Sequence, residues 1–357
     1  LGKPRAASCL SNLRELNQHV PVSLLEGALS ASADSVGRFQ VVVIVDPVHE
    51  EQLLEIGDYC HANGIRLIVA GTYGVAGFAF SDFGEEFTVF DPNGEEPRTG
   101  VIVNITQGAP GVVTVAESTP HGLADGDHVE VTGVEGMEDL NGQVYPIKVV
   151  DPNTFSICDT AGMAAYVRGG YFKEVKQPRA HKYLPLRAAL DAPPCEMTNF
   201  IDMERPQKLH ALLRALWGFR RAHGGAAPAP GNDAQAREVA EAARAFFSTA
   251  TEADERLWFR LARVSSGQLN PLAAFFGGAV GQEVLKACTG KFTPLNQWLH
   301  LDFAEMLPRE PLPAEELVPA GDRYDGQVAV LGRSFQEKLK ASRFFLVGAG
   351  ALGCEFL

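Results

Sequence analysis

Hydrophobic and polar residues alternate along the first 105 residues in a way that predicts strands and helices in turn. The pattern at Ser11–His19 predicts a helix capped by Ser11, and "VPVSLL" at 20–25 predicts a short strand. Two longer apolar runs, at 39–45 and 65–71, are typical of strands covered on both faces. The segment between them has helical spacing and a C-capping glycine, Gly64. Repeated strand–helix–strand units predict a parallel α/β sheet.

A different pattern begins near Gln107, where short segments rich in Val, Ile, Thr and aromatic residues follow one another. Gly, Asp and Asn separate these segments about every 12 residues. This spacing predicts an all-β insert, a small barrel of five or six strands, at 107–177. Just before it, Asn93-Gly94 is suited to a tight hairpin turn.

Helical spacing follows from residue 178 to about residue 266. Pro206 begins an apolar-periodic run that ends at Gly224-Gly225 and predicts a long helix. The segments 233–250 and 254–267 predict two more helices. With one further helix around 183–190, these elements form a four-helix bundle insert.

Alternation of helix and strand then resumes, with an apolar helix at 271–290 and a strand within 297–308. The order predicts a multidomain α/β protein whose first α/β domain is interrupted by the barrel and the bundle and then continues. A second α/β domain begins at about Asp322. We place the domain limits at 1–106, 107–177, 178–266, 267–321 and 322–357. Since the chain opens without Met and stops four residues after a glycine-rich turn, we expect both ends to be truncations.

That glycine-rich turn is the clearest candidate site. Phe344–Val347 is typical of a buried strand, and Gly348-Ala-Gly-Ala-Leu-Gly353 follows it as a GxGxxG turn. Glycines let the backbone come close to a phosphate, and the helix that begins there offers free N–H groups. The motif predicts a nucleotide site; the alternative is a turn that binds nothing. It does not distinguish ATP from a dinucleotide, because the acidic ribose-binding residue would lie about 20 positions further on.

Other chemistry-bearing residues form no recognisable site. "CTGKF" at 288–292 lacks the first glycine and the final Ser or Thr of a P-loop, so we expect Lys291 to be a solvated residue after a helix. The nine histidines have no metal-ligand spacing, and His210, on an apolar helix, is expected to be structural. No two of the six cysteines have CxxC spacing, and Cys195 lacks the local histidine or basic residues that activate a thiol. We therefore assign no metal ligand.

The composition and net charge of the chain argue against some kinds of binding partner. A net charge of −13 argues against nucleic acid or an anionic membrane, both of which attract clustered Lys and Arg. No apolar run approaches the roughly 18 residues of a membrane helix. With no secretory signal, the cysteines are expected to be reduced, mostly buried thiols of a cytoplasmic and nuclear protein.

The segment 323–355, "RYDGQVAVLGRSFQEKLKASRFFLVGAGALGCE", resembles the start of the active adenylation domain of the ubiquitin-activating enzymes. "PGVVTVAE", "LNGQVYPIKV", "FSICDT" and "YVRGGYFKEVK" resemble that family's first catalytic-cysteine half-domain. The segments 16–22 and 82–97 resemble the first part of its inactive adenylation domain, and 268–302 resembles the return of that domain after the four-helix insert. The likeness spans essentially the whole chain in the same interrupted order.

The resemblance implies a Rossmann-like adenylation fold of ThiF/MoeB type and an enzyme that uses ATP and magnesium to adenylate the C-terminus of ubiquitin. The enzyme would then hold ubiquitin as a thioester on its own cysteine and pass it to a ubiquitin-conjugating enzyme. Gly348, Ala349, Gly350 and Gly353 would form part of the nucleotide site. Arg323 matches an arginine that crosses to the partner's active site in symmetric bacterial relatives. In the fused arrangement it would point toward the inactive half, so we assign it no catalytic role.

Several family features are missing from this sequence. None of the six cysteines matches the catalytic one, and no residue matches the ribose or magnesium ligands beyond the phosphate turn. The resemblance therefore implies a monomeric enzyme of which this chain is an inactive piece. Two alternatives stay open: an oxidoreductase with a Rossmann cofactor site, and a non-catalytic scaffold that binds a ubiquitin-like protein. Ubiquitin is the expected modifier, although relatives for other modifiers can share the domain order.

Overall fold

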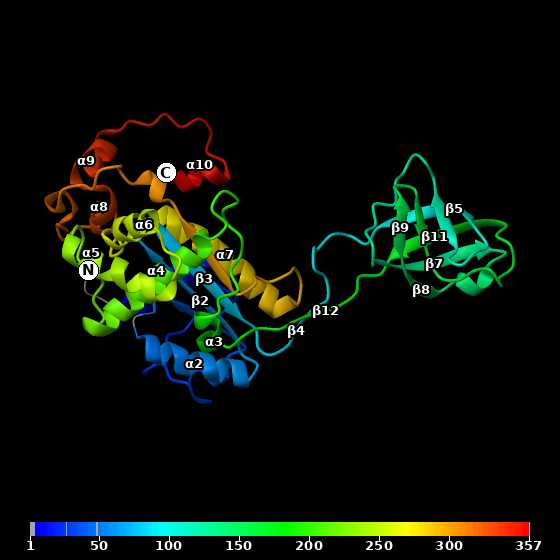
Figure 1. The fold of residues 1–357 in the computed structure, drawn as a ribbon, viewed down its shortest axis with the longest axis horizontal. Helices are drawn as coiled ribbons and strands as arrows, with labels where there is room; N and C mark the ends of the chain where they lie inside the picture. Colours follow the sequence, from blue (N-terminus) through cyan, green and yellow to red (C-terminus); the bar gives the residue numbers. More distant parts are fainter. Residues whose placement is uncertain (1–3, 26, 48, 357) are drawn as a thin grey trace. The chain divides into compact units, whose positions relative to one another are not determined.

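The computed structural model describes residues 4–25, 27–47 and 49–356, which form two compact units (Figure 1). The α/β unit contains Leu1–Glu85, Tyr183–Val284 and Leu295–Leu357. The all-β unit contains Glu86–Lys182 and Leu285–Pro294. Residues 1 and 357, the outer limits of the predicted first and last domains, lie outside the described residues.

A four-stranded mixed sheet forms the centre of the α/β unit. Its strands are β1 (Val41–Val45), β2 (Arg66–Tyr73), β3 (Ala76–Asp82) and β13 (Trp298–Asp302), in the order β1-β2-β3-β13. Only β1 and β2 are parallel; β3 is antiparallel to both β2 and β13. The prediction of a parallel sheet is thus wrong beyond the first pair, because a two-residue turn joins β2 directly to β3.

Helices cover both faces of this sheet. On one face of β3, the ring of Phe276 from α7 (Asn270–Thr289) lies over Gly77, and Ser81 Oγ donates to Glu283 of the same helix at 3.2 Å. On the other face, α2 (Glu50–Ala62) packs against Leu67 and the helical bundle packs against Phe78. The buried side chains of the sheet, α2 and the bundle form one continuous core.

The first strand departs from the prediction of burial on both faces. Val43 and Val45, which share one face of the edge strand β1, are 40% and 59% exposed, whereas Val42 on the opposite face is buried. The predicted helix at Ser11–His19 begins earlier, as α1 (Arg5–Leu16), and Ser11 lies inside it rather than at its cap. The predicted strand at 20–25 is wrong, since these residues form no strand.

Four helices form the bundle, as the periodicity predicted: α3 (Leu186–Asp191), α4 (Arg205–Ala222), α5 (Asp233–Ala243) and α6 (Glu252–Ala262). Asn232 caps α5 by accepting from the Gln235 N–H at 3.1 Å. Thr251 and Asp254 form a reciprocal capping box at the start of α6. These polar signals fix where the helices begin, while buried apolar residues decide which faces meet.

One face of β13 binds the bundle through three polar side chains at alternate positions. Trp298 Nε1 donates to the Ala189 carbonyl at 3.0 Å. His300 Nε2 lies 3.2 Å from His210 Nδ1, and Asp302 accepts two 2.7 Å hydrogen bonds from the Arg205 guanidinium. Since strand residues two apart share a face, one strand places all three partners against α3 and α4.

Seven strands form the sheet of the all-β unit, against five or six predicted. The strands are β5 (Thr99–Ile105), β6 (Val112–Val115), β7 (His128–Glu135), β8 (Gln143–Pro146), β9 (Lys148–Asp151), β10 (Thr154–Ser156) and β11 (Arg168–Glu174). Their order in the sheet is β8-β7-β11-β5-β6-β10-β9, and Phe155 and Phe172 are buried in its core. A single residue, Ile147, separates the two edge strands β8 and β9, so one bent segment closes the sheet into a small barrel. The first of these strands, β5, precedes residue 107.

A separate two-stranded ladder pairs β4 (Phe87–Val89) with β12 (Arg179–His181). The predicted hairpin at Asn93-Gly94 is wrong, because β4 pairs with a segment some 90 residues later. The local turn does form: Gly94 has φ +71° and its N–H donates to Asp91 Oδ1 at 2.9 Å. Turn residues determined the local bend but not the strand partner.

Lys176 fastens that turn to the end of the barrel. Its ammonium donates to Asp91 Oδ1 at 2.7 Å, to Asn93 Oδ1 at 2.8 Å and to the Glu95 carbonyl. The Lys176 side chain is only 13% exposed. The hydrogen bond from Lys176 holds the pKa of Asp91 at about 2.

Replacing Lys176 with methionine is expected to destabilise the all-β unit by about 2–3 kcal/mol, because Asp91 loses its closest charged donor while staying half-buried. Hydrogen exchange of β4 and β12 amides measures the effect. Lys173→Met, an exposed lysine on β11, is the matched control and is expected to change little. Equal exchange in the two variants would contradict a stabilising role for Lys176.

The remaining elements are short. Single helical turns lie at Val36–Arg38, Glu138–Leu140, Arg244–Phe246, Ala304–Met306 and Ala314–Leu317, and three helices follow at α8 (Asp325–Leu331), α9 (Arg333–Ala341) and α10 (Ala351–Phe356). Over the described ranges, no helix has both the length and the apolar character that crossing a membrane requires.

Candidate nucleotide site

The glycine-rich turn adopts a compact form that explains two of its glycines. Gly348 has φ +91°, a conformation that favours glycine. A Cβ added to Gly353 would lie 2.3 Å from the Gly348 carbonyl oxygen, so the start of α10 can pack on the turn only through glycine. A Cβ at Gly350 would meet nothing within 4 Å. The turn therefore combines a fixed backbone with open space at its middle glycine, which suits close approach of a phosphate.

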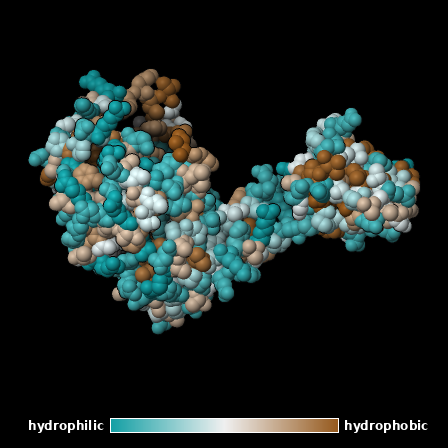
Figure 2. Space-filling model, viewed as in Figure 1, coloured by the Kyte–Doolittle hydropathy of each residue, from teal (hydrophilic) through white to brown (hydrophobic). Residues whose placement is uncertain are grey.

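The residues before the turn differ from the prediction. Phe344–Val347 forms no strand, and Phe344, Phe345 and Val347 are 87%, 92% and 84% exposed. Figure 2 shows the hydrophobic atoms of this segment and α10 gathered on one side of the α/β unit. A strand is stable only when it pairs with a neighbour and buries a face, and no described strand pairs with this segment. The prediction of a buried strand is wrong for the structure of this chain.

The segment Arg323–Gln327 lies before the turn and is held by its own local hydrogen bonds. Asp325 accepts from the backbone N–H groups of Ala320 at 2.8 Å and Gly321 at 3.0 Å. The bond from Ala320 is the largest of the effects that lower the pKa of the Asp325 carboxyl. The guanidinium of Arg323 lies 5.4 Å from the centre of the Tyr324 ring. Arg323 thus contacts a neighbouring aromatic ring and not the glycine turn.

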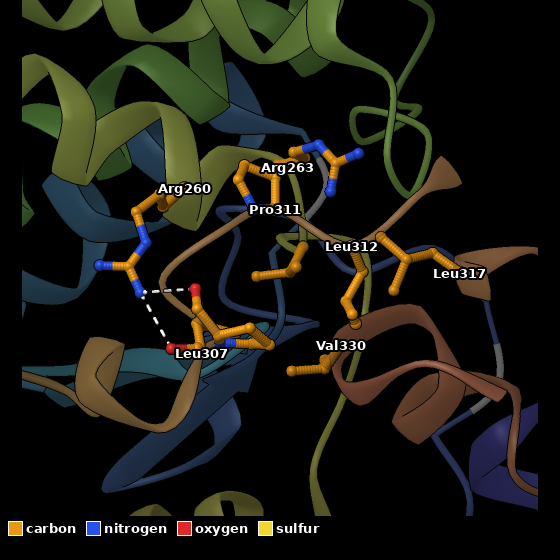
Figure 3. Close-up of a pocket in the computed structure, with 9 residues that line it drawn as sticks. Arg260, Arg263, Leu307, Pro311, Leu312, Leu317 and Val330 are labelled. Atoms are coloured by element: carbon orange, nitrogen blue, oxygen red, sulfur yellow. Dashed lines mark hydrogen bonds between the residues drawn. The ribbon is translucent and has the colours of Figure 1, made fainter. Parts of the chain in front are cut away.

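The linker to this segment crosses α6, where Arg260 binds it (Figure 3). Arg260 Nη2 donates to the carbonyls of Ala304 and Leu307, each at 3.1 Å. To the right of these bonds in Figure 3, Leu312, Leu317 and Val330 line a small cavity of about 30 Å³. Sequence reasoning missed Arg260, because an arginine on an amphipathic helix carries no signal of the carbonyls it will meet.

The rejected P-loop is a helix end in the structure. α7 ends at Thr289, and Gly290 follows with φ +63° and donates its N–H to the Lys286 carbonyl at 2.9 Å. This is the carboxyl end of a helix, which presents carbonyls rather than the N–H groups a phosphate needs. Lys291 is 52% exposed and forms a 3.4 Å ion pair with Asp91. The prediction of a solvated residue after a helix is confirmed.

The interpretation of His210 as a structural residue agrees with its burial, whereas the prediction of mostly buried cysteines is wrong, because Cys9, Cys288 and Cys354 are exposed. His210 is 4% exposed and burial lowers its pKa to about 4, as expected of a structural residue. Burial raises the pKa of Cys60 and of Cys195 to about 12, so both thiols stay protonated and unreactive. Among residues 4–25, 27–47 and 49–356, no cluster of three metal-ligating side chains occurs.

Two family models match this chain in adjacent segments. The ubiquitin-activating enzyme E1 FCCH domain matches residues 108–176, within the all-β unit. The ubiquitin-activating enzyme E1 four-helix bundle matches residues 177–246, which contain α3, α4 and α5. The two segments follow the order that the sequence predicted for the barrel and the bundle.

Individual relatives align with the whole chain. Ubiquitin-like modifier-activating enzyme 1 of Homo sapiens is 44% identical, and the alignment covers 100% of this chain and 34% of that protein. Ubiquitin-activating enzyme E1 1 of Schizosaccharomyces pombe is 42% identical over 100% of the chain and 35% of its own length. Ubiquitin-like modifier-activating enzyme 7 of Mus musculus is 41% identical over 100% of the chain and 37% of its own length.

This chain spans about a third of the length of these curated relatives. Identity above 40% along the entire chain, together with both family domains in sequence, leaves no segment outside the match. The chain belongs to the family of ubiquitin-activating enzymes.

Proposed function

We propose that the full-length protein is an ATP-dependent ubiquitin-activating enzyme. It adenylates the C-terminal carboxylate of ubiquitin, takes the ubiquitin as a thioester on its own cysteine and passes it to a ubiquitin-conjugating enzyme. The observation that carries this proposal is the alignment of all of this chain with such enzymes. A dinucleotide-dependent oxidoreductase would account for the glycine turn but not for the FCCH and four-helix domains.

In this proposal the chain supplies most of one Rossmann-like adenylation domain of ThiF/MoeB type, its two inserts and the start of a second adenylation domain. The five domain limits given above stay predictions. The enzyme would act as a monomer in the cytoplasm and nucleus. Ubiquitin is the proposed modifier, although the mouse relative at 41% identity is named for another activating enzyme, so overall identity alone does not select the modifier.

This chain would supply part of the ATP site, the phosphate contacts, and none of the assigned magnesium ligands. Gly348, Ala349, Gly350 and Gly353 would hold the phosphates, since the turn is compact and open at Gly350. When bound, ATP would supply an α-phosphate for attack by the ubiquitin carboxylate: the bond to the β-phosphate would break, pyrophosphate would leave, and the carboxylate would become an acyl adenylate with AMP as a good leaving group. These glycines would hold the phosphates in position for attack by the carboxylate. No magnesium ligands are assigned to this chain.

Gly350→Val in the full-length protein is expected to lower ubiquitin-dependent exchange of pyrophosphate into ATP by about a hundredfold. The added side chain enters open space, so it blocks phosphate approach without disturbing the fold. Exchange kinetics and the melting temperature are measured together. The 357-residue chain alone is expected to give no exchange, because the ribose, magnesium and cysteine residues are predicted to lie elsewhere in the enzyme.

Two results would contradict this proposal. Normal exchange in Gly350→Val would remove the glycine turn from the site, and no exchange by the unaltered full-length protein with ubiquitin would refute the activity. Detectable exchange by the 357-residue chain would overturn its predicted inactivity. Gly278→Ala, at an α7 position with open space around its Cβ, is the control for glycine replacement.

A further inference from the structure

Three glycines from distant parts of the chain meet at one point of the α/β unit. Gly74 lies in the turn between β2 and β3, Gly267 lies between α6 and α7, and Gly326 lies in the first turn of α8. The Gly74 N–H donates to the Gly267 carbonyl at 2.9 Å. The Gln268 N–H donates to the Gly326 carbonyl at 3.0 Å. Backbone hydrogen bonds therefore connect the sheet, the α6–α7 connection and α8 in sequence.

Each glycine is required by contact with a neighbouring backbone. A Cβ at Gly74 would lie 2.7 Å from the Val264 carbonyl oxygen, and one at Gly326 would lie 2.9 Å from the Gln268 carbonyl oxygen. A Cβ at Gly267 would lie 2.8 Å from the Gly326 carbonyl oxygen and 2.3 Å from Val330 Cγ2. Backbone atoms cannot move aside as the end of a flexible side chain can, so any larger residue separates the segments.

Conformation does not explain two of these glycines. Gly74 has φ +60°, but neither Gly267 nor Gly326 has a left-handed φ. Their role is to let backbones approach, as glycines do where helices or ligands come unusually close. Buried side chains surround the contact: Val264 and Val330 are each 5% exposed or less. The contact is thus a backbone-to-backbone junction with buried side chains beside it.

We propose that Gly74, Gly267 and Gly326 form a joint that sets the position of the second adenylation domain on the first. This inference rests on the proposed function, because α8 belongs to the predicted start of that second domain. The joint gives the segment Arg323–Gln327 a positioning role. Gly326 lets α8 pack close to the α6–α7 connection, which is bonded to the turn between β2 and β3, and the chain then continues to the phosphate turn. A shift at the joint would displace that turn from the rest of the nucleotide site.

Hydrogen exchange on the 357-residue chain tests the joint directly. In Gly267→Ala, the amides of α8 are expected to exchange at least about tenfold faster, while those of α4 and α5 stay unchanged. Gly278→Ala, which meets open space in α7, is the matched control. If Gly267→Ala does not fold, Gly326→Ala, with its single 2.9 Å approach, takes its place. Unchanged exchange in α8 would overturn the joint.

Pyrophosphate exchange by the full-length enzyme tests the positioning role. Gly267→Ala is expected to lower the maximal rate about tenfold or more with the KM for ATP within about twofold, because nucleotide contacts remain while their alignment is lost. A rate equal to that of Gly278→Ala would overturn positioning. If the unaltered enzyme shows no exchange, the proposed function fails, whereas the α8 amides still decide whether the joint exists.

Discussion

Replacing Arg205 with alanine is expected to lower the free energy of unfolding of the α/β unit by about 3–5 kcal/mol. Arg205 donates two 2.7 Å hydrogen bonds to Asp302, and the two side chains are only 15% and 5% exposed. Without the guanidinium, the Asp302 carboxylate would stay buried with no opposite charge. Arg205 also begins α4, where the helix dipole disfavours a cation, so its carboxylate partner is what makes the position favourable.

Urea unfolding followed by tryptophan fluorescence measures this loss, because all three tryptophans, Trp217, Trp258 and Trp298, lie in the α/β unit. The control is Arg187→Ala, which removes a 3.0 Å ion pair with Asp58 in which both side chains are nearly half exposed. Exposed pairs of this kind contribute about 1 kcal/mol or less. A cost for Arg205→Ala no larger than the control would refute the argument from burial.

The Arg205–Asp302 pair also illustrates what the sequence could and could not predict. The helix of Arg205 and the strand of Asp302 were each predicted from local periodicity. Their contact joins residues 97 positions apart, and nothing in either segment selects the other. The same limit applies to β4 and β12, whose pairing replaced the expected hairpin. Local patterns predict elements well, whereas pairing between distant segments depends on which surfaces the whole core brings together.

In the candidate nucleotide site, too, the sequence predicted the features that depend on neighbouring residues and missed those that depend on distant segments. The form of the glycine turn follows from residues within a span of six, so the sequence predicted it; its use by a nucleotide stays a prediction. Burial of Phe344–Val347 requires a partner strand, and none of the described strands supplies one. The glycine joint had no local signal, because each of its glycines is unremarkable until three separate segments meet. Family resemblance predicted the domain order and gave no information on these contacts.

Acid is expected to destabilise the α/β unit through its two buried histidines. Leu190 O can only accept, so His210 Nε2 donates to it at 3.0 Å and His210 Nδ1 is left to accept from His300 Nε2 at 3.2 Å. This pairing needs a neutral His210, because a protonated imidazole has no nitrogen left to accept a hydrogen bond. Burial lowers the pKa of His210 to about 4 and that of His300 well below its usual range. The unfolded chain binds protons near the ordinary histidine pKa of about 6.5.

The sign of the effect follows from these values. Above about pH 6.5 the two histidines are neutral in both the folded and the unfolded state, so their burial costs no stability. Below that pH they bind protons in the unfolded state but not in the folded state. Stability is lost from about pH 6.5 down to about pH 4, and His210 alone accounts for about 3 kcal/mol of that loss. Below about pH 4, His210 titrates in the folded state too and adds no further loss.

His210→Gln separates this contribution from that of the carboxylates, which also destabilise the fold in acid. The amide oxygen can accept from His300 but has no proton to gain in this range, so the variant is expected to lose about 3 kcal/mol less than wild type between pH 7 and pH 4. Urea unfolding followed by circular dichroism at each pH measures the difference. His49→Gln, at an exposed position in the same unit, is the control for removing an imidazole. Parallel pH profiles for wild type and His210→Gln would show that His210 does not contribute to acid destabilisation, and His210 would then have to bind its proton as readily in the folded state as in the unfolded state.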